Sequence, residues 1–410
     1  MNIHADDFPE GAPPPQVEEQ PRSLRSIVKD DSRMLARRLA EHQAANFPPN
    51  SAKTFRKLAP GEAASILGVT ESYLRQLAPP APNGERRTFS LDDLAKLRQT
   101  LAAKSRPAGK YLPHRSASEK LQVVAIMNFK GGSAKTTTAA HFAQHLALSG
   151  YRTLAVDLDP QASLTTLHGL NELDGIPSGT TMFGAIQQSG ALLPTTDIIR
   201  KTFIPFLDII PASLELQEFE FQTPTALMDA QNKRAESRPI LNRVDAALTQ
   251  VTDQYDVIVI DCPPQLGYLA ISALMASTSV LVTVHPQMLD VASLTHFLEM
   301  LGDLFDVIVN ASGGTEVNYE WFRYLITRYK PSDGPQTQMT AFLRSLFKER
   351  VLVHPAIESS AIANAGLTNQ TLYEIDRREI TRSTYDRAMD SIKTVNEELD
   401  ALIRKTWGRA

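Results

Sequence analysis

A glycine-bearing loop between a predicted strand and a predicted helix is the feature that most restricts the fold of this chain. The segment 128–140 reads NFKGGSAKTTTAA and follows the apolar run 123–127. Gly131 and Gly132 let the backbone approach a ligand closely, so that successive N–H groups and the positive end of the following helix point at anionic oxygens. This strand–loop–helix unit predicts a phosphate-binding loop in an α/β domain.

The residues of this loop have expected roles in binding a nucleotide. Lys135 supplies a positive charge for the β- and γ-phosphates, and the Thr136 hydroxyl is a ligand for Mg²⁺. The strict GxxxxGK[ST] pattern does not match, because Phe129 stands at its first glycine and Ala134 at its last. We expect Ala134 to be accommodated because alanine tolerates helical dihedrals, although it can narrow the loop or slow turnover. Lys130 is a second lysine in the loop. One lysine is enough to bind the phosphates of a single nucleotide, so Lys130 is expected to have another role. The predicted cofactor-binding residues of the loop are Gly131, Gly132, Ser133, Ala134, Lys135, Thr136 and Thr137.

Two other apolar runs end in carboxylates at distances that fit the same sheet. The segment 153–161 is a short buried-strand pattern that ends in Asp157 and Asp159. The run at 257–260 is uninterrupted, as is typical of a parallel strand covered on both faces, and Asp261 follows it. Because the carboxyl ends of parallel strands line the ligand crevice of an α/β sheet, we expect these three carboxylates near the loop. Asp261 is placed to hold a water of the Mg²⁺ shell; Asp157 either lies near Mg²⁺ or ends a strand.

Together these motifs resemble the ParA/MinD family of deviant-Walker ATPases. KGGSAKT at 130–136, DLDPQ at 157–161 and VIVIDCPP at 257–264 occur in the order and spacing of that family. The resemblance is strongest to long ParA-type plasmid partition proteins with an N-terminal DNA-binding domain, such as those of repABC plasmids. It covers residue 121 to the C-terminus by motif, and the N-terminal third by architecture.

The resemblance implies ATP and Mg²⁺ as cofactors and a homodimer as the active form. In the family the extra lysine, here Lys130, reaches across an ATP-sandwich dimer to the partner's nucleotide, and the second carboxylate, here Asp159, orients the attacking water. The family also implies binding to operator and nonspecific DNA, stimulation by a ParB-type centromere-binding protein, and repression of its own operon. The predicted catalytic residues are Lys130, Lys135 and Asp159, and the predicted metal site consists of Thr136, Asp157 and Asp261.

Other positions have structural interpretations beside the functional ones. Thr137 is consistent with an ordinary residue in the first turn of the helix. It also lies at the position where members of the family contact the α-phosphate, and we favour this contact. Arg328 follows a predicted strand, in a loop that either frames the adenine or has no contact with it. In the segment HPQMLDVASL, which follows a predicted strand, we expect Pro286, Gln287 and Asp290 to position the structure rather than to catalyse.

An uneven distribution of charge points to a nucleic acid as a partner. The formal net charge is −4, yet residues 51–110 contain eleven Lys/Arg and five Asp/Glu, so a basic module precedes an acidic remainder. Residues 59–67 read as a short helix, Gly68 supplies a turn, and Thr70 is a suitable N-cap for a second helix at 71–77. This pattern predicts a helix-turn-helix whose second helix enters a major groove. Its predicted DNA-binding residues are Thr70, Glu71, Ser72, Tyr73, Arg75 and Gln76.

A predicted wing follows the second helix. An Asn83-Gly84 turn is flanked by Arg86 and Arg87, which we expect to contact phosphates, and Ser90 then caps a further helix. The order of these elements resembles MerR-like winged domains. The alternative is a small helical protein-interaction module whose basic residues form only a solvated face, and we favour DNA binding.

The remaining pattern predicts the fold class as α/β, a doubly wound and mostly parallel P-loop NTPase sheet with an N-terminal MerR-like winged helix-turn-helix domain. Further strands are expected at 206–211, 279–284, 321–327 and 351–353, and helices at 237–252, 289–304, 338–347 and 383–406. We expect the last helix to pack on its domain rather than to target a membrane, since its polar face is acidic. The predicted divisions are a disordered start and a candidate dimerisation helix (1–50), the DNA-binding domain (51–103), a linker (104–119) and the ATPase domain (120–410). The pattern at 32–45 predicts that first helix, which either contributes to dimerisation, as the resemblance implies, or packs on its own domain.

Composition removes several classes of protein. A single cysteine, Cys262, allows no intrachain disulfide and excludes an iron protein that needs two cluster cysteines per subunit. No apolar run reaches the ~20 residues of a membrane span, so we expect a cytoplasmic protein without a membrane partner. The resemblance further implies association with the nucleoid. The favoured function is an ATP-dependent partition ATPase. The alternatives are a nucleotide-sensing transcription regulator without an active partition role, and a phosphoryl-transferring enzyme of the same fold.

Overall fold

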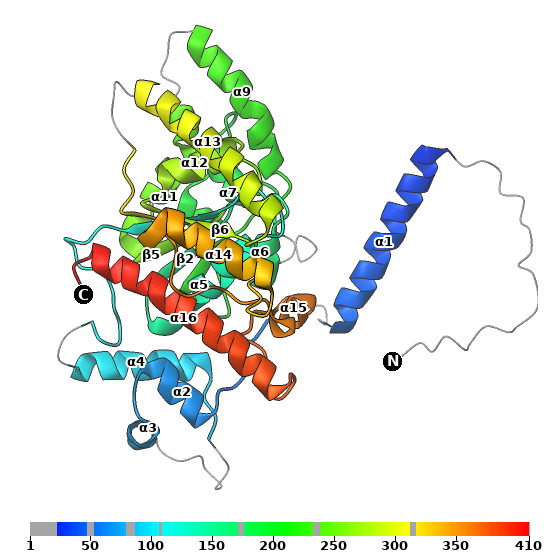
Figure 1. Ribbon diagram of the computed structural model, residues 1–410. Coiled ribbons are helices and arrows are strands. Elements are labelled where there is room, and N and C mark those ends of the chain that lie inside the picture. Colours follow the sequence, from blue (N-terminus) through cyan, green and yellow to red (C-terminus); the bar gives the residue numbers. More distant parts are fainter. Residues whose placement is uncertain are drawn as a thin grey trace, which may run out of the picture. The chain divides into compact units, whose positions relative to one another are not determined.

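The computed structural model describes residues 23–46, 53–78, 87–105, 109–170, 176–232, 238–311 and 317–409 (Figure 1). The chain divides into two compact units, residues 1–51 and 52–410. In the first unit, helix α1 (Leu24–Asn46) contains the helix predicted at 32–45 and begins earlier. Apolar side chains of α1, among them Met34 and Leu35, are exposed.

A seven-stranded sheet forms the centre of the second unit, in the order β3-β4-β2-β5-β1-β6-β7. All neighbouring strands are parallel except β3 and β4. Alternate residues of β1 belong to two apolar clusters, because successive side chains of a strand point to opposite faces and both faces are covered. The predicted mostly parallel α/β sheet is confirmed. The strands are β1 (Gln122–Met127), β2 (Thr153–Asp157), β3 (Arg200–Lys201), β4 (Leu207–Ile210), β5 (Val257–Asp261), β6 (Ser279–Val284) and β7 (Trp321–Ile326).

The helices of the sheet domain include all the predicted helical stretches. The described helices after β1 are α5 (Lys135–Ser149), α6 (Ser163–Leu167), α7 (Met182–Ile186), α8 (Thr195–Ile198), α9 (Leu216–Asn232), α10 (Arg238–Leu241), α11 (Arg243–Thr249), α12 (Tyr268–Ala276), α13 (Met288–Ala311), α14 (Gly334–Phe347), α15 (Ser360–Leu367) and α16 (Arg382–Thr406). Six of these described helices were not predicted, namely α6, α7, α8, α9, α12 and α15; α9 contains Pro224, a residue that normally ends a helical pattern.

The predicted strand at 351–353 is wrong. Only an isolated bridge joins Val351 to Tyr324, and Leu352 donates one hydrogen bond to the same Tyr324 carbonyl. The next N–H, that of Val353, donates instead to the Glu398 carboxylate at 2.7 Å. The segment therefore leaves the sheet edge after a single bridge, although its three apolar residues fit a strand pattern.

A small helical module precedes the sheet and contains α2 (Pro60–Leu67), α3 (Glu71–Leu77) and α4 (Leu91–Lys104). Gly68 ends α2 in the left-handed conformation, with φ at 66°, and the Thr70 hydroxyl accepts a hydrogen bond from the Tyr73 N–H, as expected of an N-cap. Ser90 and Asp93 form a capping box at the start of α4. The apolar core of this module is continuous with the cluster that packs α5 against the sheet.

Arg98 joins the helical module to the helix that follows the phosphate-binding loop. Its side chain is buried, and it donates hydrogen bonds to the carbonyls of Ile66 in α2, Leu148 in α5 and Tyr111. Burial lowers the pKa of Arg98 to about 10. A buried guanidinium needs all these acceptors, so the module is held against the C-terminal end of α5.

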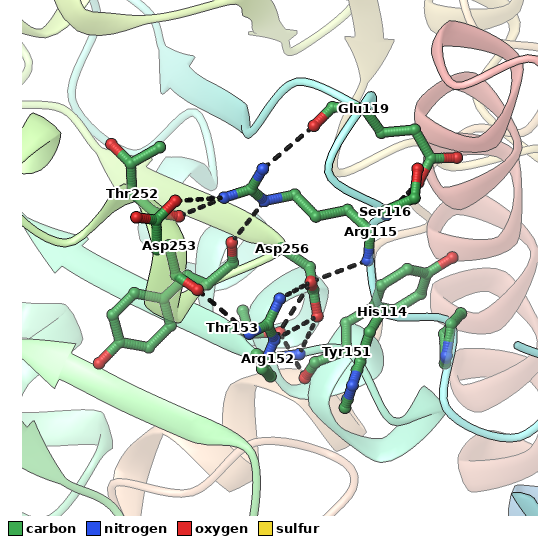
Figure 2. A network of polar contacts seen from close by, with 12 residues as sticks. His114, Arg115, Ser116, Glu119, Tyr151, Arg152, Thr153, Thr252, Asp253 and Asp256 are labelled. Carbon is green, nitrogen blue, oxygen red and sulfur yellow. Dashed lines mark hydrogen bonds and ion pairs between the residues drawn. The ribbon is translucent and has the colours of Figure 1, made fainter.

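The described part of the predicted linker is bound to the sheet domain through Arg115 (Figure 2). The Arg115 N–H donates to the Asp256 carboxylate, and its guanidinium donates to the carbonyls of Tyr255 and Thr252. Arg152 also donates to Asp256, with Nη2 2.6 Å from Oδ1. Asp256 is fully buried. It therefore connects the segment before β1 to the segment before β2.

The last helix, α16, packs on the sheet domain as predicted. Val395, Leu399 and Ile403 belong to the same apolar cluster as the buried face of α5, whereas the earlier residues Tyr385, Ala388 and Ile392 form a separate cluster with α15. Within the described ranges, every helix is too short or too polar to cross a bilayer.

Candidate nucleotide-binding site

The loop that opens α5 is held in place by the ends of neighbouring strands. The Asn128 side chain donates to the Thr283 carbonyl at the end of β6 and accepts from the Lys130 N–H at 2.8 Å. Ser133 is buried; its hydroxyl accepts from the Thr283 hydroxyl, and its carbonyl accepts from Thr327. The sequence interpretation gave no role to Asn128 or Thr283. Their positions directly after β1 and within β6 are the only signal that points to them.

Ala134 adopts a backbone conformation that the sequence interpretation did not anticipate. It precedes α5 with φ at 66° and ψ at 28°, in the left-handed region. The expectation that alanine sits there with ordinary helical dihedrals is wrong. Because a Cβ atom makes this region unfavourable by about 1–2 kcal/mol, Ala134 stores strain at the position where the Walker pattern has glycine.

Lys135 begins α5 and lies beneath the loop. Its side chain is largely buried, and its Nζ atom is 3.3 Å from the Lys130 carbonyl. Burial lowers the pKa of Lys135, while the carboxylates of Asp261 and Asp159 act in the opposite direction. An ammonium with one weak protein acceptor, placed among exposed loop glycines, is suited to an anionic ligand.

Lys130 is directed to a different partner. Its Nζ atom lies 3.0 Å from Oδ1 of Asp290, at the start of α13, and the lysine side chain is 44% exposed. Nδ1 of His285 lies 3.7 Å from the other oxygen of Asp290. Asp290, which we expected to place structure, therefore holds the second lysine of the loop within its own chain.

The three predicted carboxylates gather at the carboxyl ends of β2 and β5. Asp157 and Asp261 are partners in the strand register and both are fully buried. Burial raises the pKa of each of them, and their mutual repulsion adds to the effect for Asp261. Asp157 accepts hydrogen bonds from the N–H and hydroxyl of Thr165 in α6. Asp159 is half-buried in the loop before α6, and its carboxylate accepts from the Gln161 N–H.

These carboxylates fit a metal ion that also binds phosphate. Both side-chain oxygens of Asp261 are buried and make no hydrogen bond to any described residue, which is costly unless a ligand or water completes the site. Within the described parts of the chain, no group of three or more His, Cys, Asp and Glu could hold a metal ion alone. A Mg²⁺ ion bound there would therefore need oxygens from phosphate, from water and from the Thr136 hydroxyl.

A cavity adjoins the loop near the end of β7. In the sheet order, β7 lies on the other side of β1 from β5 and β2, which bear the carboxylates. Its volume is ≈ 340 Å³, within the range of small-ligand sites. Arg328 has φ at 52° and donates to the Gly132 carbonyl at 3.3 Å, while Glu358 binds its other terminal nitrogen at 3.2 Å. The cavity is also lined by Ala134, Thr137, His141, Ile357, Ile362 and Val395. The loop, Thr137 and Arg328 therefore border one space, large enough for a nucleoside.

The predicted DNA-binding residues lie in the helical module, apart from this site in the sequence. In α3, Ser72, Tyr73, Arg75 and Gln76 are exposed, whereas Leu74 is buried. Glu71 forms an exposed ion pair with Arg75 at 2.5 Å. The Arg87 guanidinium lies over the Phe89 ring, 5.0 Å from its centroid. Arg86 and the predicted Asn83-Gly84 turn lie outside the described residues.

Comparison with known proteins shows similarity to replication and partition proteins. An AAA domain family model matches residues 121–311. The putative replication protein A of Rhizobium rhizogenes is 48% identical over 393 residues, which cover 94% of this chain and 96% of that protein. The chromosome partitioning protein ParA of Myxococcus xanthus is 30% identical over 230 residues, covering 56% of this chain and 73% of that protein. A solved structure described as a partition protein matches with a TM-score of 0.60 and 17% identity over 91% of this chain and 98% of its own.

Proposed function

Because the chain belongs to the ParA-type family of ATPases, which includes the rhizobial replication protein A group, we propose that it is an ATP-dependent DNA-partition ATPase of a plasmid or secondary replicon. One observation carries the proposal. Lys135, Asp159 and Asp261 meet under a glycine-bearing loop that also holds a second, exposed lysine, Lys130. A single bound nucleotide uses the first three groups, so the fourth is available to a second protomer.

In this proposal each group has one task. ATP binds with its phosphates along residues 131–137 and its base in the cavity beside Arg328. Mg²⁺ is held by Thr136 and, through water, by Asp261, with Asp157 close by, and it neutralises phosphate charge. Asp159 orients the attacking water, since a carboxylate at this loop can accept its proton. Lys130 leaves Asp290 and reaches the nucleotide of a partner in an ATP-sandwich homodimer.

The helical module is proposed to bind operator DNA as a winged helix-turn-helix. Its α3 offers the exposed side chains Ser72, Tyr73, Arg75 and Gln76, a set able to contact base edges and phosphates. Thr70 caps α3, Glu71 orients Arg75, and Arg86 and Arg87 are the proposed phosphate contacts of the wing. The dimer binds nonspecific DNA on the nucleoid, in the cytoplasm, and a ParB-type protein at a centromere stimulates it. Operator binding represses its own operon.

A comparison of ATP turnover with and without nonspecific DNA and ParB-type partner tests this proposal. We expect slow hydrolysis by the chain alone, faster hydrolysis with both additions, and a monomer-to-dimer change with MgATP in light scattering. ATP binding and operator binding without any stimulated turnover would instead favour the nucleotide-sensing transcription regulator. Failure to bind ATP at all would remove both functions.

A further inference from the structure

Lys53 has a mostly buried ammonium group that is held by two carbonyls and one carboxylate. Its Nζ atom lies 2.5 Å from the Leu167 carbonyl and 2.7 Å from the Asn369 carbonyl, and it forms a 2.7 Å ion pair with Glu374. The lysine side chain is 13% exposed and the Glu374 side chain 1%. The Phe203 ring lies beneath the ammonium, with its centroid 4.9 Å away. Two hydrogen bonds and one short ion pair therefore fix the position of this ammonium.

Two groups that bind Lys53 are connected to helices that begin at the candidate nucleotide site. Leu167 is the last residue of α6, the five-residue helix that follows the loop with Asp159. The other carboxylate oxygen of Glu374 accepts from the side chain of Gln144 in α5, at 3.1 Å, and from the N–H and hydroxyl of Thr371. Lys53 therefore contacts α6 directly and contacts α5 through one carboxylate.

A helix as short as α6 depends on bonds to its surroundings. At its start, Asp157 accepts from the N–H and hydroxyl of Thr165, at 2.8 and 2.7 Å. At its end, the Leu167 carbonyl has no intrahelical donor and is bound by the Lys53 ammonium, which also complements the negative end of the helix. Asp159 lies in the short segment that joins β2 to α6. Its carbonyl accepts a hydrogen bond from the Ala162 N–H at 2.9 Å.

We infer that Lys53 is a positioning residue for ATP hydrolysis: it fixes the end of α6 and so the place of Asp159 relative to the γ-phosphate. The inference rests on the proposed ATPase function. The contacts of Lys53 include no residue of the phosphate-binding loop and not Asp261, whereas α6 contacts the proposed metal site through the bonds from Thr165 to Asp157. Loss of Lys53 should therefore slow the hydrolytic step more than it weakens ATP binding, because water orientation is sensitive to displacements of about 1 Å.

Single-turnover hydrolysis of MgATP by the full chain tests this inference. Lys53→Met keeps the length of the side chain and removes its charge and donors. We expect its hydrolysis rate to fall about 10- to 100-fold, while the Kd for ATP changes less than about threefold. Lys57→Met is the matched control, because Lys57 is exposed and lies four residues further along the same segment. It should keep the parental rate and affinity.

Hydrogen exchange of the amides at 158–168 distinguishes a local loosening of α6 from a general loss of stability, which would speed exchange in other helices as well. Lys53→Met should speed exchange there while leaving α12 and α13 unchanged, and Lys57→Met should alter neither. A folded Lys53→Met chain with the parental hydrolysis rate and parental exchange overturns the inference, as does an equal loss of rate and ATP affinity. If Lys53→Met does not fold, Glu374→Gln replaces it, with a smaller rate loss expected and the same criteria.

The exchange measurement also separates this inference from the proposed function. If the parental chain does not hydrolyse ATP, the proposed function fails. Faster exchange at 158–168 in Lys53→Met then still shows that Lys53 holds α6, whereas unchanged exchange refutes that too.

Discussion

Lys130 forms an ion pair with Asp290 of its own chain, with Nζ 3.0 Å from Oδ1. The lysine side chain is 44% exposed and the carboxylate 9%, so Asp290 holds an accessible cation at the mouth of the phosphate-binding loop. A lysine that reaches the nucleotide of a partner must first leave Asp290. The ion pair is thus an intrachain alternative to the proposed cross-dimer contact.

Lys130→Gln should bind ATP with the parental affinity but fail to hydrolyse it or to form the ATP-bound dimer. Stability should change by less than about 1 kcal/mol, because exposed ion pairs contribute little. Turnover assays with MgATP and light scattering check both parts. Lys135→Ala is the contrasting variant, and it should lose nucleotide binding itself. Parental turnover by Lys130→Gln would show that the cross-dimer role is wrong.

Asp159→Ala and Asp261→Ala should separate hydrolysis from metal-dependent binding. Asp159→Ala removes the water-orienting carboxylate and leaves the phosphate cradle, so hydrolysis should fall by about 10²-fold or more while an ATP-bound dimer accumulates. Asp261→Ala should weaken binding of ATP in the presence of Mg²⁺ and leave metal-free binding almost unchanged. Calorimetry with and without Mg²⁺ measures the difference. Equal losses of ATP affinity in both variants would contradict the assigned roles.

Ala134→Gly should stabilise the chain by roughly 0.5–1 kcal/mol, because glycine adopts φ near 66° without the steric cost of a Cβ atom and its greater unfolded-state entropy offsets only part of that gain. Urea unfolding of the chain without nucleotide measures this change. Ala140→Gly serves as the control, since Ala140 is fully buried in α5 and the same substitution there should destabilise. A loss of stability in Ala134→Gly as large as in Ala140→Gly would rule out strain at position 134.

Arg75→Ala should weaken binding to the operator by ~1–3 kcal/mol and relax its sequence preference, if the guanidinium contacts a base edge. Arg75 is 74% exposed and paired only with Glu71, so the fold should be unaffected. Footprinting of the upstream region with the full chain is the measurement. Lys96→Ala, an exposed residue of α4, is the control. Point variants are preferable to deletion of the module, because its core is continuous with that around α5. Parental protection by Arg75→Ala would exclude this residue from base recognition.

Stability should fall as the pH drops below 6.5, in part because of His168. Its ring is buried, Nδ1 lies 2.9 Å from the Leu164 carbonyl, and burial lowers its pKa from 6.5 to about 4. Between these values the unfolded chain binds the proton and the folded chain does not, so stability present above 6.5 is lost as the pH approaches 4. The loss amounts to roughly 3 kcal/mol for this group.

His168→Asn keeps a donor for the Leu164 carbonyl and cannot titrate. Urea unfolding at neutral and at mildly acidic pH should therefore show a shallower acid decline for this variant than for the parental chain. His296→Asn, at an exposed position of α13, should leave the decline as it is. An unchanged slope in His168→Asn would mean that other groups cause the acid sensitivity.

The sequence by itself determined those features that follow from short-range chemistry. The loop at 128–140, the buried strands with acids at their ends, and the cap-and-turn pattern around α3 each depend on neighbouring residues. For that reason, α3 occupies Glu71–Leu77 as predicted, and β5 ends at Asp261. The parallel sheet followed from the alternation of strands and helices.

Only the tertiary structure decided what depends on distant segments. Lys53 meets Leu167, Asn369 and Glu374, and Arg98 meets Leu148, although no local pattern links these residues. Val351 fits a strand but finds a single bridge at the sheet edge. Ala134 takes a left-handed conformation in a loop that is fixed at Ser133 by Thr283 of β6 and by Thr327, which directly follows β7. Burial and long-range hydrogen bonds outweigh local preference at such positions, since several buried polar groups left unpaired together cost more than one strained dihedral.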